Sequence, residues 1–188
     1  LNAINPSKDV DGFHIVNAAN IYLNREGVIP CTPLGCLIML RSIGQSLKGM
    51  HAVIIGRSNI VGKPMAQLLL NEDCTVTTVH SKSKNIEKIV KEADIIIAAV
   101  GIPNLVNENW VKKESIIIDV GINRINLENK TKLVGDVNFN AVQSFASYIT
   151  PVPGGVGPMT IACLLMNTVF QCSRKNKISL PSNLTNLF

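Results

Sequence analysis

The sequence predicts an α/β fold in which a doubly wound, mostly parallel sheet carries helices on both faces. Three observations lead to this prediction. Between residues 51 and 150, short apolar stretches alternate with helix-like segments, an order typical of parallel strands joined by crossover helices. Several of these stretches are apolar without alternation, as expected where helices cover both faces of a sheet. Glycines mark several of the turns at their ends.

The strands are assigned from composition. The stretch TVTTV consists almost entirely of β-branched residues, whereas HAVII, DIIIAAV and SIIIDV have the composition of buried strands. Two less apolar strands are expected near the end of the alternating region. The strands are predicted at residues 51–55, 75–79, 94–100, 115–120, 133–137 and 148–150.

The helices are assigned from spacing and capping residues. Ile86, Ile89 and Val90 fall on one helical face. Thr32 is expected to be an N-cap, with Pro33 at the first helical position. Helices are predicted at residues 62–71, 85–91 and 138–145, with two flanking helices at 34–43 and 158–174.

Composition excludes several classes of protein. Hydrophobic residues make up 46% of the chain and charged residues 16%, which suits a folded core and not a disordered chain. The longest purely apolar run, residues 95–100, is far shorter than the roughly 20 residues that cross a bilayer. We therefore expect no membrane span, and no secretory signal is recognised.

Charge and cysteine patterns narrow the possible ligands. The net charge is +5, and residues 31–71 contain no carboxylate, which favours an anionic small molecule. Nucleic acid is not expected, because aromatic residues make up only 4% and the bases are dispersed. The five cysteines form no C-x-x-C pair, so we expect neither a metal nor a redox site, and a reducing compartment.

The turn after the first strand has the features of a dinucleotide site. Gly56 and Gly62 flank a turn that follows a buried strand and opens a helix, where unpaired backbone N–H groups favour a pyrophosphate. The middle glycine of G-x-G-x-x-G is replaced by Ser58. The pattern is degenerate, and its place between strand and helix makes it informative.

The end of the second strand indicates which dinucleotide is bound. A carboxylate at this place would bind the 2′-hydroxyl of NAD, whereas residues 80–84 (HSKSK) contain none. Ser81, the nearby lysines and Arg57 would instead suit a 2′-phosphate, so NADP is favoured. A polar turn with solvated lysines is the alternative.

Two further segments are candidates for binding. Residues 150–160 (TPVPGGVGPMT) combine rigid prolines with exposed glycine amides and could frame a planar ligand, although a structural crossover remains possible. Asp9 and Asp11 are two residues apart, so both would face one side of an extended chain. They could form a turn, a weak cation site, or an acceptor for the donor edge of an aminopyrimidinone.

Eight segments, in this order, resemble the bifunctional methylenetetrahydrofolate dehydrogenase/methenyltetrahydrofolate cyclohydrolase family. They are PSKDVDGFH, IPCTPLGC, GRSNIVGKPMAQLL, TVTTVHSKS, DIIIAAVG, IIIDVGIN, KLVGDV and ITPVPGGVGPMT. The resemblance covers the chain from Leu1 to about Arg174. It implies a Rossmann-like domain in an enzyme of one-carbon metabolism that oxidises 5,10-methylenetetrahydrofolate with NADP and hydrolyses the methenyl product to 10-formyltetrahydrofolate. It also implies a homodimer and a cytosolic or organellar location, of which we expect the cytoplasm.

The resemblance also implies roles for individual residues. Asp11 resembles the carboxylate that holds the pterin ring. The loop that borders the folate cleft corresponds to Pro153, Gly154 and Gly155. The cofactor would be held by Gly56, Arg57, Ser58, Ile60, Ser81, Gly121 and Ile122, with Arg57 and Ser81 at the 2′-phosphate and Gly121 and Ile122 under the nicotinamide.

The family's catalytic lysine has no counterpart in this sequence. Neither Tyr22 nor Tyr148 is followed by Lys at the fourth position, so no Tyr-x-x-x-Lys motif is present and no catalytic residue is assigned. We expect that lysine in a domain upstream, against which the flanking helices would pack. Residues 1–28 would then be a remnant of the folate domain and link to it, 29–157 the NADP-binding domain, 158–175 a helix packing back on the catalytic domain, and 176–188 a flexible tail.

Two other functions are compatible with parts of the sequence. One is an NADP-binding module without chemistry, and the other is an NADP-dependent dehydrogenase of another small substrate. The PVPGGVGPMT and KDVDG segments argue against a dehydrogenase of another substrate, because a generic dinucleotide-binding enzyme has no need of them.

Overall fold

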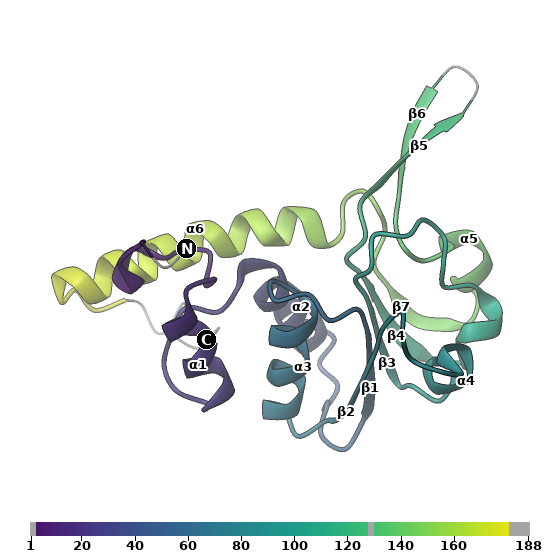
Figure 1. Ribbon diagram of the computed structural model, residues 1–188, viewed down its shortest axis with the longest axis horizontal. Coiled ribbons are helices and arrows are strands. Elements are labelled where there is room, and N and C mark those ends of the chain that lie inside the picture. Colours follow the sequence, from purple (N-terminus) through teal and green to yellow (C-terminus); the bar gives the residue numbers. More distant parts are fainter. Residues whose placement is uncertain (1–2, 128–129, 181–188) are drawn as a thin grey trace.

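The computed structural model describes residues 3–127 and 130–180 and contains a five-stranded parallel sheet (Figure 1). The strand order is β2-β1-β3-β4-β7, and every neighbouring pair is parallel. The predicted fold class is therefore confirmed. The strands are β1 (His51–Ile55), β2 (Thr75–Val79), β3 (Ile95–Ala98), β4 (Ser115–Asp119) and β7 (Ala146–Ile149).

Two apolar layers pack on opposite faces of this sheet. Side chains alternate between the faces along each strand, so Ile54 and Ile97 pack with α2 and α3, while Val53 and Ile96 pack with α4 and Trp110. Figure 1 shows the sheet between these groups of helices. The helices are α2 (Cys31–Ser42) and α3 (Gly62–Asn71) on one side, and α4 (Ile86–Lys91), η2 (Glu108–Trp110) and α5 (Phe139–Val142) on the other.

The two flanking helices differ slightly from their predicted bounds. Thr32 is not the N-cap of α2, because the helix begins at Cys31 and Pro30 occupies the cap. The Thr32 hydroxyl instead lies 3.0 Å from that of Thr160, on α6 (Val156–Asn176). The helix α6 also begins two residues earlier than predicted and packs along α2. These contacts make α2 and α6 one unit beside the sheet.

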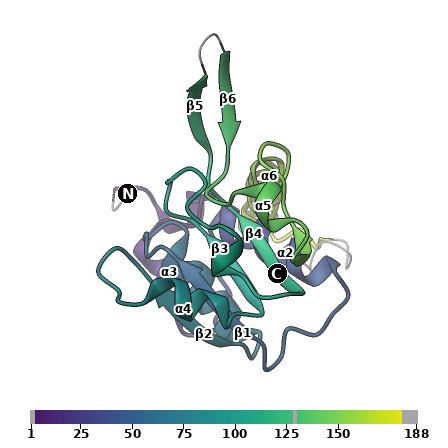
Figure 2. The ribbon, with the colours of Figure 1, turned by 90° about the vertical axis from the view of Figure 1, so that its right-hand side faces the viewer.

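The strand predicted at residues 133–137 is wrong. The chain forms an antiparallel hairpin of β5 (Asn123–Leu127) and β6 (Lys130–Val134), separate from the main sheet. The hairpin projects from the body of the molecule (Figures 1 and 2). Polar residues interrupt the apolar ones in NRINL and KTKLV, a composition unsuited to a central strand covered on both faces.

The amino-terminal segment contains structure that periodicity did not reveal. A short 3-10 helix, η1 (Pro6–Lys8), precedes α1 (Ile15–Tyr22), whose first turn is capped by His14 Nδ1 accepting from Val16 N at 3.2 Å. At the other end, α6 stops at Asn176. Of the predicted tail, residues 181–188 lie outside the described residues.

Among the described helices, α6 is the one long and apolar enough to cross a bilayer by length and composition. Its Asn167 side chain is buried and donates to the carbonyls of Val10 and Ile29, both at 2.9 Å. Gln171 donates to the carbonyl of Pro6 at 3.2 Å. These polar contacts are typical of a helix within a folded domain.

Candidate cofactor site at the carboxyl edge of the sheet

The carboxyl ends of β1 and β3 meet at the point where the strand order reverses. The chain passes from β1 to β2 on one side and then across β1 to β3 on the other. Ligands of open α/β sheets bind at such a point. Gly56, with φ of 119°, follows β1 here, and a Cβ at this residue would overlap the carbonyl oxygen of Ala99 after β3. The two loops therefore approach each other closely because residue 56 has no side chain.

The turn between β1 and α3 is held by Ser58. Its Oγ accepts from the backbone amides of Val61 at 3.1 Å and Gly62 at 3.2 Å, and its carbonyl accepts from Lys63 N at 3.0 Å. The expectation that α3 presents unpaired N–H groups is therefore wrong for these three amides. Within the part of the chain that the structure describes, the amides of residues 57–60 make no hydrogen bond, so the turn itself offers free donors.

Arg57 and Ser81 occupy equivalent positions beyond two paired strands. Ile55 of β1 pairs with Val79 of β2, and the ladder extends through Gly56 N, which donates to the Val79 carbonyl at 2.8 Å. Arg57 and Ser81 each lie two residues beyond that pair, and both are exposed. Among the described residues neither side chain has a hydrogen-bond or ion-pair partner. The edge therefore presents a free guanidinium and a free hydroxyl.

The turn after β2 orients the residues around Ser81. His80 N donates to Ser83 Oγ at 3.1 Å, and His80 Nδ1 accepts from Lys82 N at 3.1 Å. These bonds close a tight turn, with Ser81 and Lys82 exposed at its tip. No carboxylate lies in this turn, as the sequence indicated.

Gly121 and Ile122 follow β4 at the same edge. Gly121 is buried, and a Cβ there would overlap the carboxylate of Asp136. Ile122 is 63% exposed, and its Cδ1 approaches the start of α6 at Gly157. The structure thus places Ile122 near the first turn of α6, which follows the loop that contains Pro153.

That loop connects β7 to α6. Pro153 and Gly154 are exposed, and the Val152–Pro153 peptide bond is cis. Gly154 has φ of 104° with no atom near its missing Cβ, so its conformation rather than crowding favours glycine. Gly155 N donates to the Pro151 carbonyl at 3.0 Å and leads into α6.

The two carboxylates of the KDVDG segment do not face one side, so this expectation is wrong. Asp9 is buried and accepts from Gly12 N at 3.0 Å, His14 N at 2.8 Å and Asn17 Nδ2 at 2.8 Å. Burial raises the pKa of Asp9, but these hydrogen bonds outweigh burial and lower it below its usual value. The chain turns at Gly12, and Asp11 is left exposed. Only Asp11 is available to a ligand.

A groove of about 760 Å³ joins the Asp11 segment to the turn after β1. On one side lie Gly12 and Phe13, and on the other Asn59, Ile60 and Lys63. The groove therefore brings Ile60 and the residue after Asp11 to the same space. Ser81, Gly121 and Gly155 do not line it.

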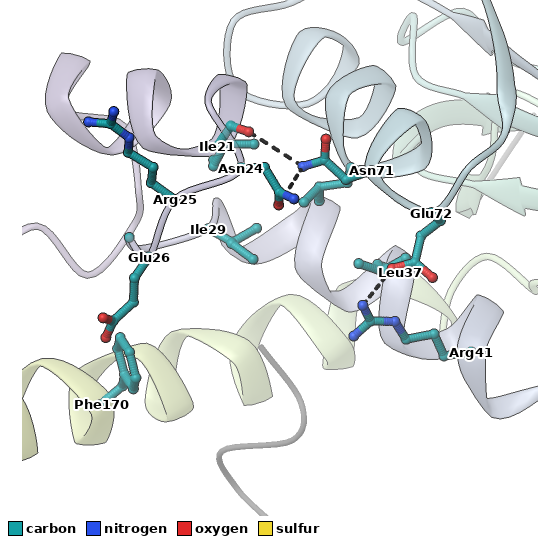
Figure 3. Close-up of a pocket in the computed structure, with 12 residues that line it drawn as sticks. Ile21, Asn24, Arg25, Glu26, Ile29, Leu37, Arg41, Asn71, Glu72 and Phe170 are labelled. Carbon is teal, nitrogen blue, oxygen red and sulfur yellow. Dashed lines mark hydrogen bonds and ion pairs between the residues drawn. The ribbon is translucent and has the colours of Figure 1, made fainter.

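A second cavity, of about 530 Å³, lies among α1, α2, α3 and α6 (Figure 3). Arg41 Nη2 lies 2.5 Å from Glu72 Oε1, and Asn71 Nδ2 donates to Asn24 Oδ1 at 3.3 Å. None of the predicted site residues lines this cavity.

Sequence reasoning missed two buried carboxylates at the edge, Asp119 and Asp136. Asp119 ends β4 and is 3% exposed, and Asp136 follows β6 and is fully buried. Burial raises the pKa of Asp119 to about 6, against the lowering effect of backbone hydrogen bonds. For Asp119, the sequence signal was a carboxylate at the end of an otherwise apolar strand.

The side chains that could bind a metal do not gather into a site among the described residues. Within residues 3–127 and 130–180, no cluster of three or more His, Cys, Asp or Glu residues is suitably arranged. Burial raises the pKa of the Cys36 thiol to about 12 and that of Cys163 to about 11, so both remain protonated at neutral pH.

The family model for the tetrahydrofolate dehydrogenase/cyclohydrolase NAD(P)-binding domain matches residues 30–176. The chain belongs to this family. Among curated relatives of the family, the bifunctional protein FolD 1/3 of Ruegeria pomeroyi is 58% identical over 185 residues, covering 98% of this chain and 62% of the relative. The chain therefore spans about three-fifths of the length of such relatives.

Solved structures of family members have the same fold. The FolD enzyme of Campylobacter jejuni superposes with a TM-score of 0.89 at 50% identity, covering 93% of this chain and 61% of its own. The Trypanosoma brucei methylenetetrahydrofolate dehydrogenase-cyclohydrolase, solved with NADP and an inhibitor, has a TM-score of 0.87 at 41% identity, covering 92% of this chain and 60% of its own. The resemblance noted in the sequence is confirmed.

Proposed function

We propose that this member of the family binds NADP and forms part of an enzyme that oxidises 5,10-methylenetetrahydrofolate to 5,10-methenyltetrahydrofolate and hydrolyses this product to 10-formyltetrahydrofolate. The observation that carries the proposal is the carboxyl edge of the sheet, where Arg57 and Ser81, without partners among the described residues, lie at a turn whose amides are free of the same residues. An edge of this kind in a chain of this family suits a phosphorylated dinucleotide.

The residues at the edge fit the pyrophosphate and the 2′-phosphate of this cofactor. Gly56 lets the loop after β3 approach the turn closely, and the amides of residues 57–60 can donate to a pyrophosphate. In our proposal Arg57 and Ser81 hold the 2′-phosphate by charge-assisted hydrogen bonds. Ser58 fixes the turn and Ile60 lines the path. NADP, when bound, accepts the hydride that leaves the folate methylene carbon.

The nicotinamide end would lie over Gly121 and Ile122. The exposed Ile122 side chain offers an apolar surface for a planar ring and excludes water from it. Its nearness to the start of α6 joins this surface to the loop of Pro153, Gly154 and Gly155, which in our proposal borders the folate cleft.

Asp11 would fix the pterin. Its exposed carboxylate can accept hydrogen bonds from the pterin amide and amine, and the buried Asp9 beneath it holds the turn in shape. Oxidation and hydration occur at one carbon, so one bound pose serves both steps.

We propose that the general acid–base lysine belongs to the part of the family's length that this chain does not span. Residues 1–28 would be a remnant of that part and link to it, and 158–175 would be a helix packing back on it. Residues 29–157 would form the cofactor domain and 176–188 a flexible tail. An exposed apolar stripe on α6, made of Ile161, Leu165 and Val169, supports a contact of this kind.

The proposal extends to assembly and location. We infer a homodimer through the cofactor domain, because a projecting two-stranded hairpin is marginally stable unless another surface covers it. Tetrahydrofolate derivatives are the substrates, and we propose neither nucleic acid nor a membrane as a partner. A cytoplasmic location is supported by the five cysteines, all of which are free.

The test compares this chain with the full-length protein. The chain should bind NADP in a calorimetric titration and turn over no folate, whereas the full-length protein should carry out both reactions. Binding without turnover by the full-length protein would favour the non-catalytic module. Cyclohydrolase activity from the chain alone would contradict our assignment of the chemistry to the lysine-bearing part.

A further inference from the structure

Two buried carboxylates join three loops at the carboxyl edge of the sheet. Asp119 is the last residue of β4, and Asp136 lies between β6 and α5. They are 3% and 0% exposed. Among the described side chains, neither forms an ion pair with a Lys or Arg, so their charges are met by hydrogen bonds.

Asp136 binds the loop after β3 to the beginning of the hairpin. Its Oδ2 accepts from the consecutive amides of Val100 at 2.7 Å and Gly101 at 2.9 Å. Its Oδ1 accepts from Asn123 Nδ2 at 2.9 Å. Two adjacent amides aimed at one oxygen favour a carboxylate, because charge-assisted hydrogen bonds are the stronger ones.

Asp119 in turn holds Asp136. Its Oδ1 accepts from Asp136 N at 2.9 Å and from Gly121 N at 3.0 Å, and its Oδ2 accepts from Val137 N at 2.9 Å. Asp119 N also donates to Thr150 Oγ1 at 2.8 Å, at the entrance to the proline-rich loop. The loops after β3, β4 and β6 are thus cross-linked through two side chains.

The backbone around the two carboxylates leaves no room for a side chain at two neighbouring glycines. A Cβ on Gly121 would overlap the Asp136 carboxylate, and one on Gly135 would overlap that of Asp119. Glycine at residue 121 is therefore required by the carboxylate, whatever ligand lies above it. A network packed this closely has few other arrangements.

The position of the network indicates what it supports. The phosphate-binding candidates Arg57 and Ser81 follow β1 and β2, whereas Val100, Gly101 and Gly121 follow β3 and β4, on the other side of the point where the strand order reverses. A dinucleotide that crosses this point has its adenosine on one side and its nicotinamide on the other. We propose that Asp119 and Asp136 are positioning residues that fix the nicotinamide half of the site, an inference that rests on the proposed function.

The test compares NADP with adenosine 2′,5′-bisphosphate, which lacks the nicotinamide half. Asp136→Ala should weaken NADP binding about tenfold, since several hydrogen bonds to the loops are lost, and should leave bisphosphate binding within about twofold. Amide hydrogen exchange at Val100 and Gly101 should become faster, and at Arg57 it should not change.

Three further variants complete the test: a conservative substitution, a control for stability and a substitute for Asp136→Ala. Asp136→Asn keeps an oxygen for both loop amides, and its amide can donate to Asn123 once that side chain turns over, so NADP binding should be retained. Val142→Ala removes buried bulk from α5 and should lower stability without changing the affinity for either probe. If Asp136→Ala does not fold, Asn123→Ala removes one bond to Asp136 and should weaken NADP alone, by about threefold.

The outcomes separate this inference from the proposed function. If Asp136→Ala, or Asn123→Ala in its place, weakened the binding of NADP and of the bisphosphate equally, the positioning role would be overturned. The proposed function would stand. An Asp136→Ala variant that behaves like Val142→Ala would overturn it as well. If the unchanged chain bound neither probe, the proposed function and this inference would both be overturned.

Discussion

Single residues at the carboxyl edge divide into those that shape the backbone and those that meet the ligand. Gly56 and Gly121 belong to the first group, because a Cβ on either would overlap a neighbouring loop or carboxylate. Arg57 and Ser81 belong to the second, because both are exposed and neither has a partner among the described residues. Substitutions in the two groups should therefore have different effects.

Arg57→Ala should weaken NADP binding by about 1 to 3 kcal/mol, the contribution of a charge-assisted contact, and leave NAD binding nearly unchanged. Isothermal titration with both cofactors measures this difference. Lys91→Ala, which removes an exposed charge on α4, is the control for net charge. Equal losses for NADP and NAD would remove Arg57 from the 2′-phosphate site.

Gly56→Ala should destabilise the fold by several kcal/mol, because it combines a positive φ with an overlap against Ala99. Gly44→Ala is the matched control, since its φ is 75° and no atom lies near the missing Cβ. This control should cost only about 1 kcal/mol. Urea unfolding of both variants gives the comparison, and similar losses would contradict the close approach of the two loops.

Asp119 should make stability depend on pH. Its pKa is raised by burial from 3.8 to about 6, so the native state keeps a proton that the unfolded chain has lost between these values. The resulting stabilisation is complete below about pH 4 and is lost as the pH rises through about 6, a change of about 3 kcal/mol. Urea unfolding should show a smaller decline for Asp119→Asn over this range. If the free energy of unfolding depended on pH equally in Asp119→Asn and in the unsubstituted chain, the raised pKa of Asp119 would be contradicted.

At the scale of elements, the hairpin and α6 differ from the rest of the fold. The strands of the main sheet have helices on both faces, whereas β5 and β6 pair only with each other and project outward. The helix α6 packs on α2 along one side and exposes Ile161, Leu165 and Val169. Both elements offer surface that further protein could cover.

Ile125→Asp in β5 should shift the chain from the proposed dimer to a monomer, because in that dimer a charge would be buried where the hairpin meets a second copy. NADP affinity should be retained, since Ile125 is not among the residues proposed to contact or position the cofactor. Sedimentation velocity measures the mass. Arg124→Ala is the control within the same strand. If the unsubstituted chain sediments only as a monomer at tens of micromolar, this result would count against the dimer.

At the scale of the whole molecule, one groove connects the amino-terminal segment to the cofactor edge. Gly12, Phe13, Asn59 and Ile60 all line this groove of about 760 Å³. The groove therefore joins the residue after Asp11 to Ile60, the one proposed cofactor residue that lines it. A change at Asp11 should affect every step that uses the bound folate.

Asp11→Asn in the full-length protein should lower both dehydrogenase and cyclohydrolase activities, because one pterin pose serves both steps. Steady-state assays of the two reactions test this. Ser7→Ala, an exposed residue just upstream, is the control. Loss of one activity with the other intact would show that the two steps do not share this contact.

The local sequence determined most of the parallel sheet and its helices. The β-branched and apolar stretches specified β1, β2, β3 and β4, and the helix at Gly62–Asn71 was predicted with its observed ends. The candidate cofactor residues could also be named, because a turn between strand and helix is a local pattern. Periodicity did not detect the hairpin or α1, since short polar–apolar segments have no strong period.

Only the tertiary structure decided the arrangement of the carboxylates. Asp9 is buried and hydrogen-bonded whereas Asp11 is exposed, and this difference depends on α1 and α6 packing over the turn. Asp119 and Asp136 are 17 residues apart and meet because β4 and the end of the hairpin converge at one edge. The sequence by itself determined which strands form, because those depend on neighbouring residues, and on the same local residues it predicts a preference for NADP. The hydrogen bonds that fix the loops join distant residues, so only the fold could bring their partners together.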